Sequence, residues 1–211
     1  MVAPRRTLTL LVAGVLVLGT VWALWPRPAR QLPTSAGSAG TTIVFLGDSI
    51  THGHRLAQEA AFPHRLGQAL GVRTINAGIS GDTTEGGLRR IERDVLAHRP
   101  QVVVVALGVN DAFRQAPRED TVANLRAITQ RIRAQGAVVV LLHTAIPHVA
   151  GDGNRQDLRR IARAEDAMLV EDFLQSVVPQ HTYDGLHPDA EGQAMLAERL
   201  LPVLRQALGR P

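Results

Sequence analysis

Five short apolar runs, rich in β-branched residues, place the strongest constraint on how this chain can fold. They occupy residues 42–46, 72–76, 101–107, 137–142 and 168–170. Most of them lack the polar alternation of a sheet with one face in water, so we expect strands buried on both faces. Strands of this kind are typical of parallel sheets, which need helices over both faces.

Segments with helical spacing separate these runs. Asp82 and Glu85 predict a capping box at the start of one helix. The last helix should start near Asp189 and kink at Pro202. Apolar residues three or four apart mark the other helices, over residues 122–132 and 158–161. With right-handed crossovers, this alternation predicts an α/β domain: a three-layer α/β/α, doubly wound, five-stranded parallel sheet over residues 41–211.

An uncharged apolar segment, residues 7–25, precedes this domain and follows Arg5 and Arg6. As a helix at about 1.5 Å per residue it would span roughly 28 Å, about one hydrocarbon core. The 19 residues of this segment exceed the usual apolar region of a secretory signal, about 7–15 residues. We therefore expect an uncleaved anchor rather than a signal that is cut within residues 35–40. A buried core helix is the weakest alternative. Residues 26–40 have the Pro, Gly and Ser content of a linker.

The two arginines ahead of the apolar segment favour a cytoplasmic N-terminus. We therefore expect a bacterial inner-membrane protein whose domain lies on the periplasmic side, or a secreted protein if the segment is cleaved. The chain has no Cys, which excludes a disulfide scaffold, a thiolate nucleophile and a Cys-based zinc site.

The charge of the chain does not indicate a nucleic-acid partner. All 23 basic residues are Arg, and the formal net charge is +4. Four of the 23 arginines precede residue 41, where there is no acidic residue, which leaves 19 arginines against 19 acidic residues in the domain. A neutral domain lacks the positive surface that binds a phosphate backbone.

Polar, glycine-containing segments follow the first, second and third predicted strands and, after a short connection, the fifth. We expect all four segments at one edge of the sheet. They are residues 47–50, 76–82, 108–111 and 184–188. In doubly wound folds, ligands bind beyond the carboxyl ends of the strands. The four segments therefore outline a candidate site.

These segments hold the groups that acyl transfer needs. Ser49 would supply the nucleophilic hydroxyl, His187 the base, and Asp184, three residues before it, the carboxylate that orients the imidazole. The Ser49 N–H, the Gly78 N–H and the Asn110 amide are candidate oxyanion donors. Alternatively, Gly78 is a glycine only because the backbone there needs a positive φ, and Asn110 is only a turn residue.

Other residues near the site have simpler interpretations. We interpret Asp48 and Asp111 as structural hydrogen-bonding residues. Ser80 is not expected to be a nucleophile, because Gly81 follows it directly and breaks the Gly-x-Ser-x-Gly spacing.

The histidines outside the candidate triad give no metal signature. His52 and His54 would need partners for zinc, and no ligand spacing supports that site. We expect His143 and His148 at a pocket edge or on the surface. An acyl pocket could be lined by Ile146, Pro147 and Val149, although loop packing explains these residues equally well.

The four segments resemble, in order and spacing, the sequence blocks of the SGNH (GDSL-type) hydrolases. Residues 47–50 resemble the nucleophile block, and residues 184–188 the block with the acid and the base. The resemblance covers about residues 42–208 and favours the bacterial branch of arylesterases, lysophospholipases and acyl thioesterases. It implies a flavodoxin-like fold, a triad of Ser49, Asp184 and His187, an oxyanion hole from Ser49, Gly78 and Asn110, and no cofactor or metal.

The resemblance implies a serine esterase whose partner is a small acyl ester or lipid, with thioesters or lysophospholipids as further substrates. An envelope carbohydrate O-acetylesterase or acetyltransferase would use the same triad. A catalytically silent binding module is a third interpretation, which the complete triad disfavours. Aromatic residues make up only 3% of the chain, so an aliphatic groove is a better expectation than a stacking platform for sugars.

Overall fold

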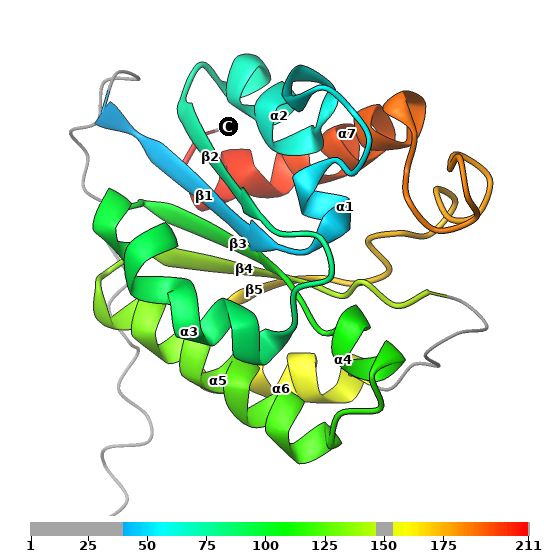
Figure 1. Cartoon of the computed structure of the whole chain (residues 1–211). Helices are drawn as coiled ribbons and strands as arrows, with labels where there is room; N and C mark the ends of the chain where they lie inside the picture. Colours follow the sequence, from blue (N-terminus) through cyan, green and yellow to red (C-terminus); the bar gives the residue numbers. More distant parts are fainter. Residues whose placement is uncertain (1–39, 147–153, 211) are drawn as a thin grey trace, which may run out of the picture. The chain divides into compact units, whose positions relative to one another are not determined.

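A five-stranded sheet forms the centre of the computed structural model, which describes residues 40–146 and 154–210 (Figure 1). All neighbouring strands are parallel, and their order is β2-β1-β3-β4-β5, the flavodoxin-like order. The strands are β1 (Thr42–Gly47), β2 (Arg73–Gly78), β3 (Val102–Ala106), β4 (Val138–Leu142) and β5 (Met168–Val170). The predicted α/β class and parallel five-stranded sheet are confirmed.

The burial of each strand follows its place in the sheet. Every residue of β1 and β3 is buried, as continuous apolar runs predict. In β2 and β5 most residues are only half-buried. The prediction that all strands are buried on both faces is therefore wrong for these two, because each lies at an edge with one neighbour instead of two.

Helices cover both faces of the sheet (Figure 1). The short helices α1 (Ser49–His52) and α4 (Val109–Phe113) directly follow strands. The longer helices are α2 (Phe62–Leu70), α3 (Thr84–Asp94), α5 (Arg118–Ala134), α6 (Arg155–Ala164) and α7 (Ala190–Ala207), and two 3₁₀ turns lie at Gln58–Ala60 and Leu96–His98.

Alternate side chains of β1 supply two separate cores. Phe45 packs in the cluster that holds the apolar residues of α2 and α7, such as Leu200. Leu46 packs in the cluster of α3, α5 and α6, with Ile128. Because successive strand residues point to opposite faces, one fully apolar strand fastens both helical layers.

Helix boundaries show where the sequence signals were incomplete. Helix α2 was not predicted, although Pro63 in its first turn and Gly71 after its last residue, at φ 63°, are start and stop signals. Asp189 caps α7 as expected, accepting the N–H of Gly192, and the helix continues through Pro202 to Ala207.

The predicted capping box at Asp82 and Glu85 is wrong. Thr83 is the N-cap of α3, and its hydroxyl accepts the N–H of Gly86. The Asp82 carboxylate is held instead by Arg90, eight residues further along.

The expected anchor (residues 7–25) and the linker up to residue 39 lie outside the described residues. Across residues 40–146 and 154–210, none of the helices combines the length and the apolarity that crossing a bilayer requires.

Gln193 of α7 fixes the start of two other helices. Its buried side chain accepts the N–H of Phe62 at 2.9 Å and donates to the Ile50 carbonyl at 3.0 Å. Both bonds are buried, and they join α7 to α2 and to α1, the helix that begins at Ser49.

Replacing Gln193 by Ala should therefore destabilise the domain. Each buried backbone group left without a partner costs about 1–3 kcal/mol, so we expect a loss on the order of 3 kcal/mol in the free energy of unfolding. Urea denaturation of residues 40–211 measures it. Gln206→Ala, an exposed change on the same helix, should cost less than about 0.5 kcal/mol; equal effects of the two changes would contradict the prediction.

Candidate active site

Three side chains from distant parts of the sequence form one hydrogen-bonded chain at the carboxyl edge of the sheet. His187 Nε2 lies 3.1 Å from Ser49 Oγ, and His187 Nδ1 lies 2.7 Å from Asp184 Oδ2. Ser49 is the first residue of α1, directly beyond β1. The structure thus brings together the three residues that the sequence predicted to meet.

The turn that carries Asp184 and His187 is fixed by the Asp184 carboxylate itself. Its Oδ1 accepts the N–H groups of Leu186 at 3.1 Å and His187 at 2.7 Å. Desolvation raises the pKa of Asp184, but these bonds and the bond from the His187 ring outweigh it and lower the pKa to about 2. Asp184 is therefore ionised at neutral pH and can accept the Nδ1 proton of His187.

Asp48 orients the start of α1, the helix that carries Ser49. Its Oδ1 accepts the N–H of Ile50 at 3.0 Å, which makes Asp48 the N-cap of the helix that begins at Ser49. The side chain is buried. Desolvation, reinforced by the charges of Asp82 and Asp111, raises the pKa of Asp48 to about 7 against the opposing Ile50 bond. Asp48 has the structural hydrogen-bonding role that the sequence suggested.

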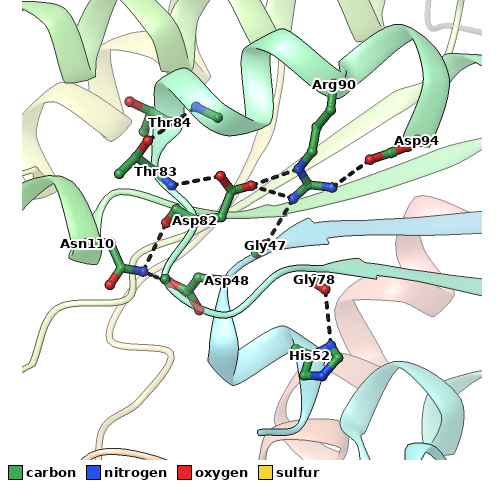
Figure 2. A network of polar contacts seen from close by, with 12 residues as sticks. Gly47, Asp48, His52, Gly78, Asp82, Thr83, Thr84, Arg90, Asp94 and Asn110 are labelled. Carbon is green, nitrogen blue, oxygen red and sulfur yellow. Dashed lines mark hydrogen bonds and ion pairs between the residues drawn. The ribbon is translucent and has the colours of Figure 1, made fainter.

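Asn110 belongs to α4, the short helix that follows β3. Its Nδ2 donates to the Asp82 carbonyl at 2.9 Å and more weakly, at 3.5 Å, to Asp48 Oδ2 (Figure 2). These two acceptors hold the amide group beside the N-cap of α1, so its position is set before any substrate binds.

A buried arginine holds the surrounding loops together. Arg90 of α3 pairs with Asp82 Oδ2 at 2.7 Å and with Asp94 at 3.3 Å, and it donates to the Gly47 carbonyl at 3.2 Å (Figure 2). Gly47 directly precedes Asp48, and the Asp82 carbonyl is the acceptor of Asn110. The ion pair therefore connects the two loops on which Ser49 and Asn110 depend.

The geometry argues against Gly78 as an oxyanion donor. Its N–H already donates to Asn76 Oδ1 at 3.0 Å, and its carbonyl accepts from His52 Nδ1 at 3.2 Å. A Cβ at Gly78 would lie 2.4 Å from the His52 nitrogen, so glycine is needed because α1 packs closely on β2.

Gly81, three residues further along the same loop, has the freer N–H group. It adopts φ 77°, and its carbonyl accepts from Arg114 Nη2 at 2.7 Å. Within residues 40–146 and 154–210, no acceptor for the Gly81 N–H is found. Gly81 also directly precedes Asp82, whose carbonyl holds Asn110.

The remaining predicted residues have supporting or separate positions. Asp111 is buried and accepts the N–H of Thr84 at 3.0 Å, a structural role as expected. Ser80 is exposed, with its Oγ 3.3 Å from His54 Nδ1. Over the described residues, no group of three or more His, Asp or Glu side chains is arranged to hold a metal ion.

A cavity of about 190 Å³ lies beside α4 and the carboxyl ends of β3 and β4. His143 lines it, as a pocket-edge residue was expected to do, but it is only 2% exposed and is not a surface histidine. Ile146 belongs to the buried core, so it neither lines this cavity nor packs in an exposed loop, while Pro147, His148 and Val149 lie outside the described residues. The other lining residues include Leu107, Gly108, Val109, Ala112, Thr144 and Ala145.

The sequence analysis missed the side chains that surround the His187 ring. The His54 ring centroid lies 4.6 Å from that of His187, and the Tyr183 ring stacks at 6.1 Å. Desolvation, followed by the charges of His187 and Arg55, lowers the pKa of His54. The available signal was adjacency: Tyr183, the only tyrosine of the chain, directly precedes Asp184.

Comparisons with known proteins show which family the chain resembles. Residues 45–195 match the GDSL-like lipase/acylhydrolase family. An arylesterase of Vibrio mimicus is 32% identical over 177 residues, which cover 78% of this chain and 88% of the relative. Thioesterase 1/protease 1/lysophospholipase L1 of Escherichia coli K12 is 33% identical over 178 residues, covering 79% of this chain and 85% of the relative. The crystal structure of TesA superposes with a TM-score of 0.74 at 32% identity, covering 80% of this chain and all of TesA (100%).

The raised pKa of Asp48 predicts how stability varies with pH. Its pKa is 3.8 in the unfolded chain and about 7 in the folded one, so the folded state holds the proton more tightly. Asp48 therefore lowers stability as pH rises from about 4 to 7, by up to about 1.4 kcal/mol per pH unit, and adds no change above that range.

Asp48→Asn should remove this contribution, so the variant should gain stability relative to wild type between pH 4 and pH 7. Urea denaturation across that range measures the difference. Asp120→Asn, an exposed change in the first turn of α5, is the control and should keep the wild-type slope. Parallel curves for Asp48→Asn and wild type would contradict the prediction.

Proposed function

The chain belongs to the GDSL-like lipase/acylhydrolase family of ester-hydrolysing enzymes, and we propose that it is a serine esterase built on Ser49, His187 and Asp184. The hydrogen-bonded chain from Asp184 through His187 to Ser49 Oγ carries this proposal. It supplies a nucleophile, a base within reach of the hydroxyl proton, and a carboxylate that fixes the tautomer of the base.

The geometry gives each group one task in the reaction. Ser49 Oγ attacks the acyl carbon while its proton moves to His187 Nε2, and the resulting imidazolium is stabilised by Asp184. The bond between the acyl carbon and the leaving oxygen then breaks, and that oxygen takes the proton from Nε2. A water molecule releases the acyl group from Ser49 by the same two proton transfers, which restores the enzyme.

The oxyanion that forms in each step needs donors in fixed positions. The Ser49 N–H is the first of α1 and has no intrahelical acceptor. Asn110 Nδ2 is the second donor that we propose. The Asp82 carbonyl holds one of its two N–H groups at 2.9 Å, and the other makes only a weak 3.5 Å contact with Asp48, which an oxyanion can replace. For the third we propose the Gly81 N–H in place of that of Gly78, which Asn76 occupies.

Covalent labelling tests the nucleophile. A fluorophosphonate probe should label wild type and Ser80→Ala, whose altered residue is an exposed serine of the same site region. Ser49→Ala should lose labelling and several orders of magnitude in kcat, because the hydroxyl that forms the acyl-enzyme is gone. Labelling that survives Ser49→Ala would refute the assignment, and intact-mass measurement of the adduct shows whether it has moved to another residue.

For substrates we propose short to medium acyl esters, with thioesters and lysophospholipids as further candidates. The cavity beside α4 supports this class, because apolar residues form much of its lining, among them Leu107 just after β3 and Val109 and Ala112 of α4. An aliphatic acyl chain suits such a lining, whereas sugars are typically bound by aromatic platforms that this chain is poor in.

The residues 40–211 should therefore hydrolyse p-nitrophenyl esters of short to medium acyl chains faster than acetylated xylan or peptidoglycan. The measurement is kcat/KM across these substrates, with Ser49→Ala as the blank. A clear preference for the acetylated polysaccharides would favour the carbohydrate O-acetylesterase that shares the same triad.

We also propose that residues 7–25 anchor the enzyme in the bacterial inner membrane with its domain on the periplasmic side. The length and the lack of charge of the segment support this. Full-length protein should stay in the membrane after carbonate washing, and protease added from the periplasmic side should digest the domain. A soluble form beginning near Thr41 would show instead that the segment is a cleaved signal.

A further inference from the structure

The proposed reaction fixes where the leaving group of an ester must lie. The leaving oxygen takes its proton from His187 Nε2, so the alcohol part of the substrate has to pass beside the His187 ring. The oxyanion, in contrast, faces Asn110. Residues packed around His187 therefore form the surroundings of the leaving group, and their charge bears on which alcohols are accepted.

A layered group of side chains lies on this side of the site. Tyr183 is nearly parallel to the His187 ring, at 14° and 6.1 Å. The Arg55 guanidinium carbon lies 5.6 Å from the Tyr183 centroid, within the range of a cation–π contact. Arg55 thus places a positive charge against the ring that stacks on the base.

Two features hold Arg55 in place. The Tyr183 hydroxyl donates to the carbonyl of His54, the residue directly before Arg55. Arg55 itself adopts φ 63°, a left-handed conformation that residues other than glycine rarely adopt. Such a conformation persists only where its surroundings enforce it, and it fixes the direction in which the side chain leaves the loop.

The Arg55 charge is also available to a ligand. The side chain is exposed, and among the residues that the structure describes no carboxylate pairs with it. The nearby Asp184 carboxylate is already bonded to two backbone N–H groups and to the His187 ring. Arg114 and Arg118, two exposed arginines on the Asn110 side, already have partners, the Gly81 carbonyl and the Asp157 carboxylate. Arg55 is therefore an exposed cation on the His187 side of the site that is available to the leaving group.

We propose that Arg55 is a specificity-determining residue that binds an anionic group on the leaving alcohol. This inference rests on the proposed function. A phosphate, sulfonate or carboxylate would suit it, because the planar guanidinium can donate two parallel hydrogen bonds to such groups. The anion has to stand several bonds from the ester oxygen, as in an acyl glycerol phosphate or a para-substituted phenyl ester, since Arg55 contacts Tyr183 and Tyr183 in turn contacts the His187 ring.

Two phenyl butanoates test the proposal on the full-length protein. One carries a para-sulfonate and the other a para-sulfonamide, so both leaving groups are electron-poor phenols and only one is anionic. At low salt, Arg55→Gln should lower the sulfonate-to-sulfonamide ratio of kcat/KM about tenfold. Arg55→Lys should keep part of the ratio, because it retains the charge but loses the planar fork.

Further variants separate a local contact from general electrostatics. Tyr183→Phe keeps the ring and loses the bond to the His54 carbonyl, so the ratio should fall part of the way. Arg126→Gln, an exposed change on α5, should leave the ratio unchanged. Added salt should lower the wild-type ratio toward that of Arg55→Gln, because salt screens exposed charges.

Each outcome bears on one proposal. If both esters are hydrolysed by wild type, neither by Ser49→Ala, and Arg55→Gln keeps the wild-type ratio, the role of Arg55 is overturned while the esterase stands. If Ser49→Ala hydrolyses both esters as fast as wild type, the esterase proposal fails, and the role of Arg55 fails with it. In the Arg55, Tyr183 and Arg126 variants, hydrolysis of the sulfonamide ester reports whether the protein is folded.

Discussion

The ion pair between Arg90 and Asp82 connects the parts of the site that follow different strands. A buried charge is costly unless it is paired and its remaining hydrogen-bonding groups are satisfied. Arg90 meets this condition with two carboxylates, those of Asp82 and Asp94, and with the carbonyl of Gly47. Its partners lie at the last residue of β1, after β2 and at the last residue of α3. Satisfying one guanidinium therefore sets the positions of two loops at once, and the carbonyl of Asp82 extends that order to Asn110.

Close packing of α1 against the sheet supplies the second constraint. A Cβ at Gly47 would lie 2.1 Å from Thr51 Oγ1, and one at Gly78 would lie 2.4 Å from the backbone of His52. Two paired glycines of β1 and β2 thus let the short helix that begins at Ser49 lie directly on the sheet edge. A four-residue helix has little stability of its own. Its N-cap Asp48 and the bond from Gln193 to Ile50 compensate, so the nucleophile sits on a fixed support.

The sequence predicted the parts of this site that depend on topology alone. Parallel strands bring their carboxyl ends to one edge, so Ser49 and the turn from Asp184 to His187 could be placed together because each follows a predicted strand. Gly78 was predicted to donate its N–H to the oxyanion. Sequence spacing does not show that the Asn76 side chain accepts this N–H in the folded chain. Asp82 was wrongly predicted as a helix cap because its partner, Arg90, lies eight residues away and reaches it only in the folded chain.

The two aspartates beside Ser49 show how environment divides one residue type into two roles. Asp184 is held by three donors, and its pKa is lowered to about 2, so it carries a full negative charge that favours a positive His187. Asp48 is buried, and desolvation outweighs the bond from the Ile50 N–H and raises its pKa to about 7. An ionised Asp48 would oppose an oxyanion held by Asn110, whose amide lies 3.5 Å from it. Burial keeps a proton on Asp48 below that pH, which removes one negative charge from the Asn110 side of the site, while Asp184 keeps its charge beside His187.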